Sequence, residues 1–220
     1  MAFQFTKANC VAVGTFNMYI IQPAWLAKVG IIPKGIGVAI ESKLDEPGFR
    51  FSSPKLPVRW YVTPSRIQVE TQRADADCGE PVASVFKSLP EMPLIALGNN
   101  AVYQATLDDL QAIPSMSSFW REGPGGFKSV QRTLHYGLER EETVFNVQLA
   151  ITEKNLEVLV NAHTELRERA TEDAQKAARR FFEDRQTGER LIEHLFQVRV
   201  TYVEPDIRPA EETDGADRGK

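Results

Sequence analysis

The chain has 220 residues, enough for one large domain or two small ones, and its 42% hydrophobic and 25% charged residues are typical of a globular protein. The net charge is −4, but six acidic residues face three basic ones from Glu204 onward. The preceding body therefore carries −1 (23 bases against 24 acids), which gives no general attraction to nucleic acid or to an anionic membrane and leaves a local basic patch open.

The first half of the chain predicts strands and two short helices. Residues 10–22 are rich in β-branched and aromatic side chains and predict a strand, which a short helix over 23–29 follows. A second strand over 36–42 precedes a loop with three prolines. Alternating apolar residues predict a hairpin over 58–72, and helical spacing predicts an amphipathic helix over 80–89.

The second half predicts a similar order of elements. It begins with a strand over 93–105 and a short helix over 106–113, for which Thr106 is a candidate cap. The other predicted elements are strands over 129–138, 142–152, 155–163 and 194–203 and a long helix over 164–185. The polar tail that follows has too little apolar surface to fold alone.

Two pairs of segments indicate that the chain is one unit built twice. Residues 13–26 match residues 97–110 at an offset of 84, and residues 56–71 match residues 145–160 at an offset of 89. An insertion of five residues, near the glycines at 123–126, reconciles the two offsets. The alternative explanation is that strands in general prefer the same β-branched residues.

We therefore predict an α+β fold in which two pseudo-duplicated β-α-β-β-β-α units form one curved antiparallel sheet with helices packed on one face. The first half-repeat covers 1–91, and the second half-repeat with a closing strand covers 92–203. Together they are expected to form one compact domain, which a flexible acidic tail over 204–220 follows. In element order alone the layout resembles the saddle of the TATA-box-binding protein and the helix-grip ligand-binding folds, and this resemblance implies no function.

The sequence contains no motif of an active site, a metal centre or a cofactor site. None of the three histidines lies within four residues of another histidine or of a cysteine. The segment 34–41 lacks the third glycine of a dinucleotide-binding loop and enters a strand. We expect no catalytic residues, no metal and no cofactor.

The cysteine content and the lengths of the apolar stretches indicate the cellular compartment of the protein. Cys10 and Cys78 allow one disulfide but no disulfide framework. The longest apolar stretches are strand-sized, well short of the roughly 18–20 residues that span a membrane. We expect a reduced, cytoplasmic protein with no membrane partner.

Three places remain as candidate binding surfaces. Asn99 and Asn100 interrupt an apolar strand, either at a bulge or as polar contacts on the concave face of the sheet. The glycine-rich segment 117–132 combines aromatic and basic side chains, which suit either a binding edge or a hydrophobic anchor for the loop. Arginines of the long helix suit an acidic partner or a solvated face. The candidate binding residues are Asn99, Asn100, Trp120, Arg121, Phe127, Lys128, Arg132, Arg179 and Arg180.

The favoured function is a non-catalytic binding or assembly module that recognises another protein, or a second copy of the chain, through a curved sheet face or an unpaired strand edge. The first alternative is nucleic-acid binding on the concave sheet. It requires convergence of Arg59, Arg66, Arg73, Lys128 and Arg132 on one side. The second alternative is a small-molecule pocket or an enzyme between sheet and helices that uses His135 or His163.

Overall fold

The computed structural model describes residues 2–42, 47–106, 131–152, 155–166 and 171–202. Ten strands in this part of the chain form one sheet. The strands are β1 (Ala2–Gly14), β2 (Ala39–Ser42), β3 (Phe49–Ser52), β4 (Arg59–Val62), β5 (Arg66–Thr71), β6 (Leu94–Thr106), β7 (Gln131–Arg140), β8 (Thr143–Thr152), β9 (Asn155–Glu165) and β10 (Arg199–Thr201). The sheet confirms the predicted α+β class with a large antiparallel sheet.

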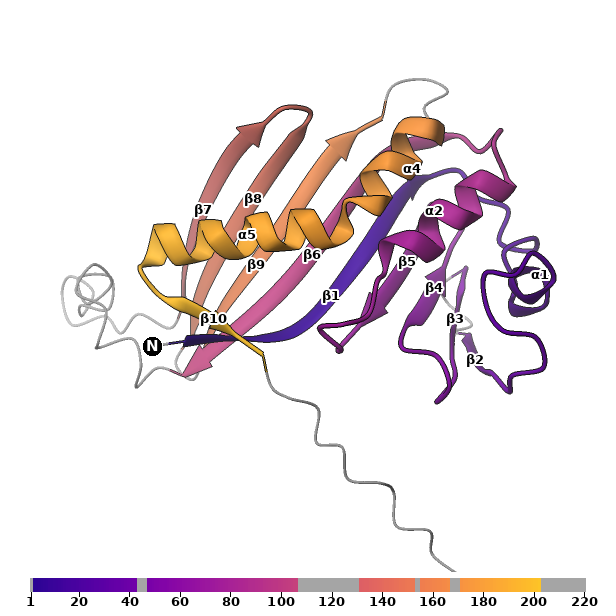
Figure 1. The fold of residues 1–220 in the computed structure, drawn as a ribbon, viewed down its shortest axis with the longest axis horizontal. Coiled ribbons are helices and arrows are strands. Elements are labelled where there is room, and N and C mark those ends of the chain that lie inside the picture. The colour runs from indigo at the N-terminus through magenta and orange to yellow at the C-terminus, as the bar shows by residue number, and fades with distance from the viewer. Residues whose placement is uncertain (1, 43–46, 107–130, 153–154, 167–170, 203–220) are drawn as a thin grey trace, which may run out of the picture.

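The strand order across the sheet is β2-β3-β4-β5-β1-β6-β9-β8-β7, as Figure 1 shows. Neighbouring strands on this path are antiparallel. The short strand β10 lies off the path and pairs in parallel with the beginning of β1. The long strands β1 and β6 therefore lie at the centre of the sheet, and β2 and β7 form its edges.

Helices cover one face of this sheet. The helices of the described residues are α1 (Pro23–Lys28), α2 (Gly79–Ser88), α4 (Thr171–Arg179) and α5 (Phe181–Phe196). Figure 1 shows α2, α4 and α5 on the same side, with α5 crossing the strands β7 to β6. We call the opposite side of the sheet the open face.

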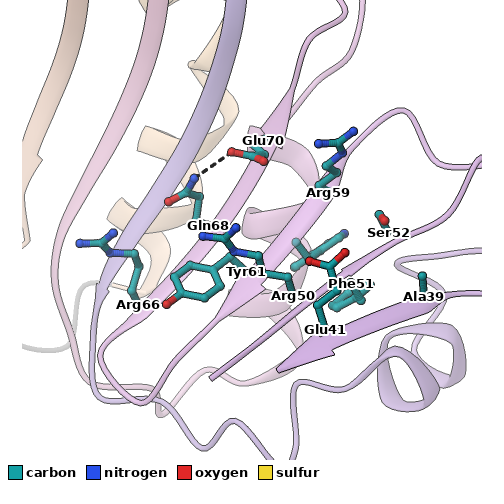
Figure 2. A pocket seen from close by; sticks show the side chains of 11 residues that line it. Ala39, Glu41, Arg50, Phe51, Ser52, Arg59, Tyr61, Arg66, Gln68 and Glu70 are labelled. Atoms are coloured by element: carbon teal, nitrogen blue, oxygen red, sulfur yellow. Dashed lines mark hydrogen bonds between the residues drawn. The ribbon is translucent and has the colours of Figure 1, made fainter. Parts of the chain in front are cut away.

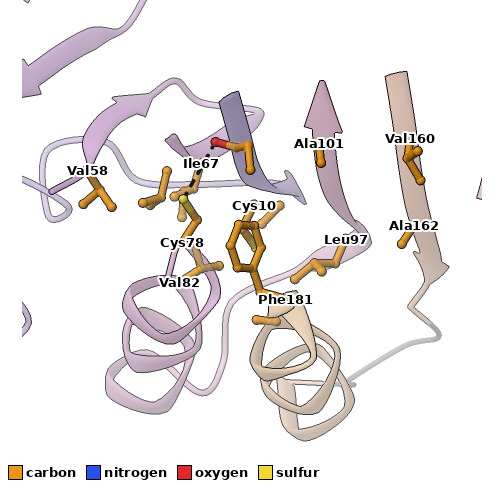
Figure 3. Close-up of a cluster of buried hydrophobic side chains, with 14 of the residues drawn as sticks. Cys10, Val58, Ile67, Cys78, Val82, Leu97, Ala101, Val160, Ala162 and Phe181 are labelled. Atoms are coloured by element: carbon orange, nitrogen blue, oxygen red, sulfur yellow. Dashed lines mark hydrogen bonds between the residues drawn. The ribbon is translucent and has the colours of Figure 1, made fainter. Parts of the chain in front are cut away.

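Strand periodicity decides which residues reach the helices, because successive side chains point to opposite faces. In β1, the residues Ala8, Cys10 and Ala12 are buried, while Asn9 and Val11 are only partly covered. An irregularity in the pairing of β1 with β6 between Phe5 and Lys7 keeps the buried side chains on the helix side along the whole strand. Buried residues from the central strands and from α2 and α5 form the core in Figure 3.

Two glycines let the helices approach closely. A Cβ atom on Gly79, the first residue of α2, would collide with the carbonyl oxygen of Ala178 in α4. A Cβ atom on Gly188 in α5 would lie 2.7 Å from Cγ1 of Val160 in β9. The absence of side chains at these two positions sets the distances between α2 and α4 and between α5 and the sheet.

The structure corrects three predicted elements. The strand over 10–22 begins eight residues earlier and ends at Gly14, because the chain then turns and Asn17 accepts a hydrogen bond from the Tyr19 amide. The proline-rich loop contains strand β3, which pairs with both β2 and β4. The long helix over 164–185 begins later, since β9 extends to Glu165, and it is broken at Arg180 into α4 and α5.

Other elements agree with their predictions. The hairpin is β4 and β5, the two short helices are α1 and α2, and the strands β6 to β9 lie where the sequence places them. The closing strand is shorter than the predicted 194–203, because α5 continues to Phe196. The helix predicted over 106–113 and the tail 204–220 lie outside the described residues, apart from Thr106, which ends β6.

The register bears on the proposed duplication in two different ways. Trp60 pairs with Val69 in the first hairpin, and Leu149 pairs with Val158 in the β8–β9 hairpin, which matches the offset of 89. The other segment match does not hold in register, because Gly14 ends β1 whereas Gly98 lies inside β6. The duplication therefore stays a prediction.

Candidate functional site

The open face carries a row of amide side chains across its centre. Four asparagines lie in register on neighbouring strands: Asn9 of β1 pairs with Asn100 of β6, Asn100 with Asn161 of β9, and Asn161 with Asn146 of β8. We call these four residues the amide row. Asparagine is poorly suited to strands, so four of them side by side indicate a specific role at this face.

The amide row is a directional chain of hydrogen bonds. Asn146 donates Nδ2 to Oδ1 of Asn161 at 3.1 Å, Asn161 donates to Asn100 at 2.6 Å, and Asn100 donates to Asn9 at 2.7 Å. Each carboxamide has two donor hydrogens and an oxygen with two acceptor sites, so the chain uses only part of this capacity. The remaining donors and acceptors are available to a ligand that lies on the open face.

A second feature of the open face is a hollow of about 340 Å³ over the strands β2 to β5. We call it the arginine hollow. It is lined by Arg50, Arg59, Tyr61, Arg66, Gln68 and Glu70, among others, and Figure 2 shows these side chains on the strands of this end of the sheet. The three arginines are exposed, whereas Tyr61, Gln68 and Glu70 are half-buried.

Contacts inside the arginine hollow leave the guanidinium groups free of acidic partners. Arg50 lies over the Tyr61 ring, 5.0 Å from its centroid. Glu70 is opposite Arg59 in the register of β4 and β5, but its carboxylate accepts a hydrogen bond from Gln68 Nε2 at 3.2 Å. Among the described residues, no ion pair involves any of the three arginines.

Two further hollows continue across the open face. One of about 430 Å³ shares Arg66 with the arginine hollow and reaches over β1 and β6 to β9. Another of about 520 Å³ shares Asn100, Leu159 and Asn161 with it and reaches β7 at His135. The three hollows therefore adjoin one another across the strands, with the amide row near the middle, and we call this series of hollows the groove.

The helix side of the same strands holds a buried polar cluster instead. Asn99 is 5% exposed and donates Nδ2 to the carbonyl oxygen of Ala177 at 3.0 Å and to Oδ2 of Asp184 at 2.8 Å. Burial raises the pKa of Asp184, while its hydrogen bond from Asn99 and the charge of Arg180 oppose that shift. Arg180 also donates to Oγ1 of Thr143 at 2.8 Å. This cluster ties α4 and α5 to the sheet.

The predicted pair of asparagines thus divides between the two faces. Asn100 lies on the open face, as the hypothesis of a polar sheet contact states, and Asn99 is buried beneath the helices. Neither residue sits at a bulge, because the register shifts between β1 and β6 lie between Phe5 and Lys7 and between Val13 and Gly14.

The other predicted binding residues that the structure describes do not join this face. Arg179 forms an ion pair with Glu80 of α2 at 3.1 Å, and Arg180 belongs to the buried cluster. In β7, Arg132 is on the same face as Leu134 and Tyr136, which is the helix side of the sheet. Four candidates lie outside the described residues: Trp120, Arg121, Phe127 and Lys128.

The residues on which the two alternative functions depend do not come together in the way that either function requires. Arg59 and Arg66 line the same hollow, but Arg73 lies beyond β5 in an ion pair with Asp75 at 2.7 Å. His135 and His163 line hollows of the open face rather than a pocket between sheet and helices. A cavity of about 10 Å³ does lie on the helix side, beside Asn99 and Asp184, and is about the size of one water molecule.

The sequence analysis missed Arg50 and three residues of the amide row. The sequence predicts a loop around Arg50, and a loop prediction does not indicate which face of the sheet this residue occupies in β3. Asn9, Asn146 and Asn161 each occupy a polar position of an alternating strand, and this alternation is the signal that could have found them. Their alignment depends on the register between strands, which no single strand encodes.

The described residues show few features of a reactive centre. Burial raises the pKa of both thiols, Cys10 and Cys78, and therefore favours their protonated forms. Within the described ranges, no cluster of three or more histidine, cysteine or acidic side chains could hold a metal ion. None of the helices in this part of the chain has the length and apolar character needed to cross a membrane.

Comparisons with known proteins leave the family open: no protein-family model matches the chain, and no curated protein matches it.

Proposed function

We propose that the protein is a non-catalytic binding module that recognises another protein through the open face of its sheet. The observation that carries this proposal is the series of adjoining hollows across the strands, which places the arginine hollow beside the amide row. Helices cover the other face, so the open face is the large polar surface that the sheet presents to a ligand.

The chemistry of the groove suits a polypeptide. The side-chain carboxamides of the amide row have the same donor and acceptor groups as a peptide bond, so they can pair with the main chain of an extended segment. Nine strands spaced by ~4.8 Å give a groove of roughly 38 Å, which an extended segment of about 11 residues would span.

We further propose that the binding surface is built from two similar halves of the sheet. In our proposal the sheet is a pseudo-duplicated unit, with the β4–β5 hairpin equivalent to β8–β9 and β1 equivalent to β6. The centre of the groove would then lie at the junction of the two copies.

A matched pair of substitutions tests the proposal by affinity capture from the native host. Gln148→Arg places a charge and a long side chain in the groove, whereas Gln186→Arg makes the same change at an exposed position of α5. We expect Gln148→Arg to reduce capture of a stoichiometric protein at least tenfold after nuclease treatment, and Gln186→Arg to leave it unchanged.

Equal capture by both variants would contradict the proposal, as would loss of bound material on nuclease treatment. Thermal unfolding of each variant provides the control for folding. Neither Gln148 nor Gln186 has a side-chain hydrogen bond among the described residues, so both variants should unfold at the temperature of the wild type.

A further inference from the structure

Among the described residues, the three arginines of the arginine hollow form no ion pair with the acidic residues that lie nearby. Glu41 is opposite Arg50 in the register of β2 and β3, and Glu70 is opposite Arg59. Neither carboxylate forms an ion pair with its arginine, since Arg50 stacks on Tyr61 and Glu70 is held by Gln68. Three exposed guanidinium groups therefore surround a concave space and remain available to an external anion.

We infer that the arginine hollow is a subsite for the carboxylates of an acidic segment of the protein partner, an inference that rests on the proposed function. Guanidinium groups present a planar fork of donors that matches a carboxylate in bidentate geometry. The three arginines lie on the consecutive strands β3, β4 and β5 but are staggered along them: Arg50 is opposite Tyr61, two residues from Arg59, and Tyr61 is opposite Gln68, two residues from Arg66.

Arg50 and Arg59 are diagonal neighbours on β3 and β4, with backbones roughly 7–8 Å apart, and this spacing favours acidic residues at alternate positions of an extended segment. Side chains two residues apart in a strand point to the same side, roughly 7 Å from one another. Flexible arginine side chains on neighbouring strands can close on two such carboxylates. The amide row begins one strand further along, at Asn9 of β1, and is placed to pair with the main chain that follows the acidic residues.

The distribution of acidic residues argues against a nucleic acid as the occupant. Glu41 and Glu70 line the arginine hollow itself, and Glu157 lines the next hollow of the groove. A phosphate backbone that followed the groove would meet these carboxylates, whereas a peptide needs only one or two anionic side chains at the arginines. The Tyr61 ring, on which a base would stack, is already covered by Arg50.

Fluorescence anisotropy tests the subsite with two labelled probes at low ionic strength. One is a hexapeptide that alternates glutamate and serine, and the other is a thymidine hexanucleotide. The variants are Arg50→Gln, Arg59→Gln, Arg66→Gln and the triple variant, and the matched control is Arg190→Gln on the exposed side of α5.

We expect the acidic peptide to bind more tightly than the nucleotide. Each single substitution should weaken peptide binding about two- to fivefold, as expected for exposed ion pairs, and the triple variant should abolish it. Arg190→Gln should leave the affinity unchanged, and added salt should weaken binding by the wild-type chain.

Three results would overturn the inference: tighter binding of the nucleotide with the same arginine dependence, peptide binding that survives the triple substitution, or no binding of either probe. The two proposals can fail separately. If the triple variant loses the peptide while Gln148→Arg still captures protein, the subsite stands and the groove-wide function fails. The opposite pattern retains the function and removes the subsite.

Discussion

At the scale of single residues, Asn99 and Asn100 show how one strand serves two purposes. Asn100 belongs to the amide row on the open face, and Asn99 points the other way into the packed helices. The carbonyl group of Ala177 lies in the last turn of α4, where carbonyl groups lack helical partners, so the Asn99 donor satisfies it. The same residue type therefore contributes to packing on one face and, in the proposed function, to recognition on the other.

Asn99→Leu should destabilise the fold by about 2–3 kcal/mol. The substitution removes a buried donor and leaves the carbonyl group of Ala177 and the carboxylate of Asp184 without it. Asn146→Leu, at the exposed end of the amide row, should change stability by less than about 0.5 kcal/mol. Urea unfolding of both variants measures the difference, and equal costs would refute the assigned roles.

Asp184 should give the protein a specific pH dependence of stability. Burial raises its pKa above the ordinary 3.8, so the ionised form is less favourable in the folded chain than in the unfolded chain. The contribution of Asp184 to the free energy of unfolding therefore becomes more favourable as the pH falls through the raised pKa. It becomes constant below 3.8, where the carboxyl group is protonated in both the folded and the unfolded chain. The free energy of unfolding of the wild type relative to that of Asp184→Asn should therefore rise as the pH falls over the same range.

Chemical denaturation of wild type and Asp184→Asn from neutral to acidic pH tests this dependence. Other carboxyl groups titrate in both proteins and cancel in the difference. A difference in the free energy of unfolding that stays constant with pH would contradict the assigned pKa direction.

At the scale of elements, the helix layer depends on two positions without side chains. Gly79 allows α2 to touch α4, and Gly188 allows α5 to lie on β9. Gly79→Ala should cost about 1–3 kcal/mol or more, because the new methyl group would meet backbone that cannot move away easily. Gly188→Ala should cost a similar amount through contact with Val160.

Gly137→Ala is the matched control for these substitutions. Its added Cβ would meet nothing within 4 Å, and alanine restricts the unfolded chain, so its stability should be unchanged or slightly higher. Thermal unfolding of the three variants measures the effects. The account of helix packing fails if Gly137→Ala is as destabilising as Gly79→Ala.

Elements with local signals were predictable from the sequence, and elements that depend on partners were not. The β4–β5 hairpin has alternating residues and a proline turn, and α2 has a complete helical stripe. Strand β3 has four residues between loop-forming prolines, and it exists because β2 and β4 pair with its two edges. The end of β9 was assigned to a helix because Thr164 and Glu165 suit a helix start, yet both pair with β6.

At the scale of the whole molecule, the candidate site arises from strand order. The sequence predicted that Asn99 and Asn100 are either bulge residues or polar contacts on the sheet, but Asn9 and Asn161 become neighbours of Asn100 only when β1, β6 and β9 lie side by side. The arginine hollow likewise requires the order β3-β4-β5. Such non-local pairing explains why composition and periodicity located the sheet but not the groove.

The distribution of charge on the open face also belongs to this scale. Its β3–β5 end carries the three free arginines, and Glu157 of β9 and Glu139 of β7 follow at the other end. A net charge of −4 therefore conceals an uneven distribution of charge on the open face, in which Glu41 and Glu70 also lie at the arginine end. Such a surface orients a partner with complementary charges and disfavours a uniformly charged polymer.

Site-specific photo-crosslinking in the native host tests the open face most directly. A benzophenone amino acid is placed at Gln104 and Asn146 on the open face, and at Lys87 and Gln186 on exposed helix positions. The account predicts a discrete protein adduct from both open-face positions and none from the helices. Adducts formed only from the helix positions, or adducts with nucleic acid from the open face, would contradict it.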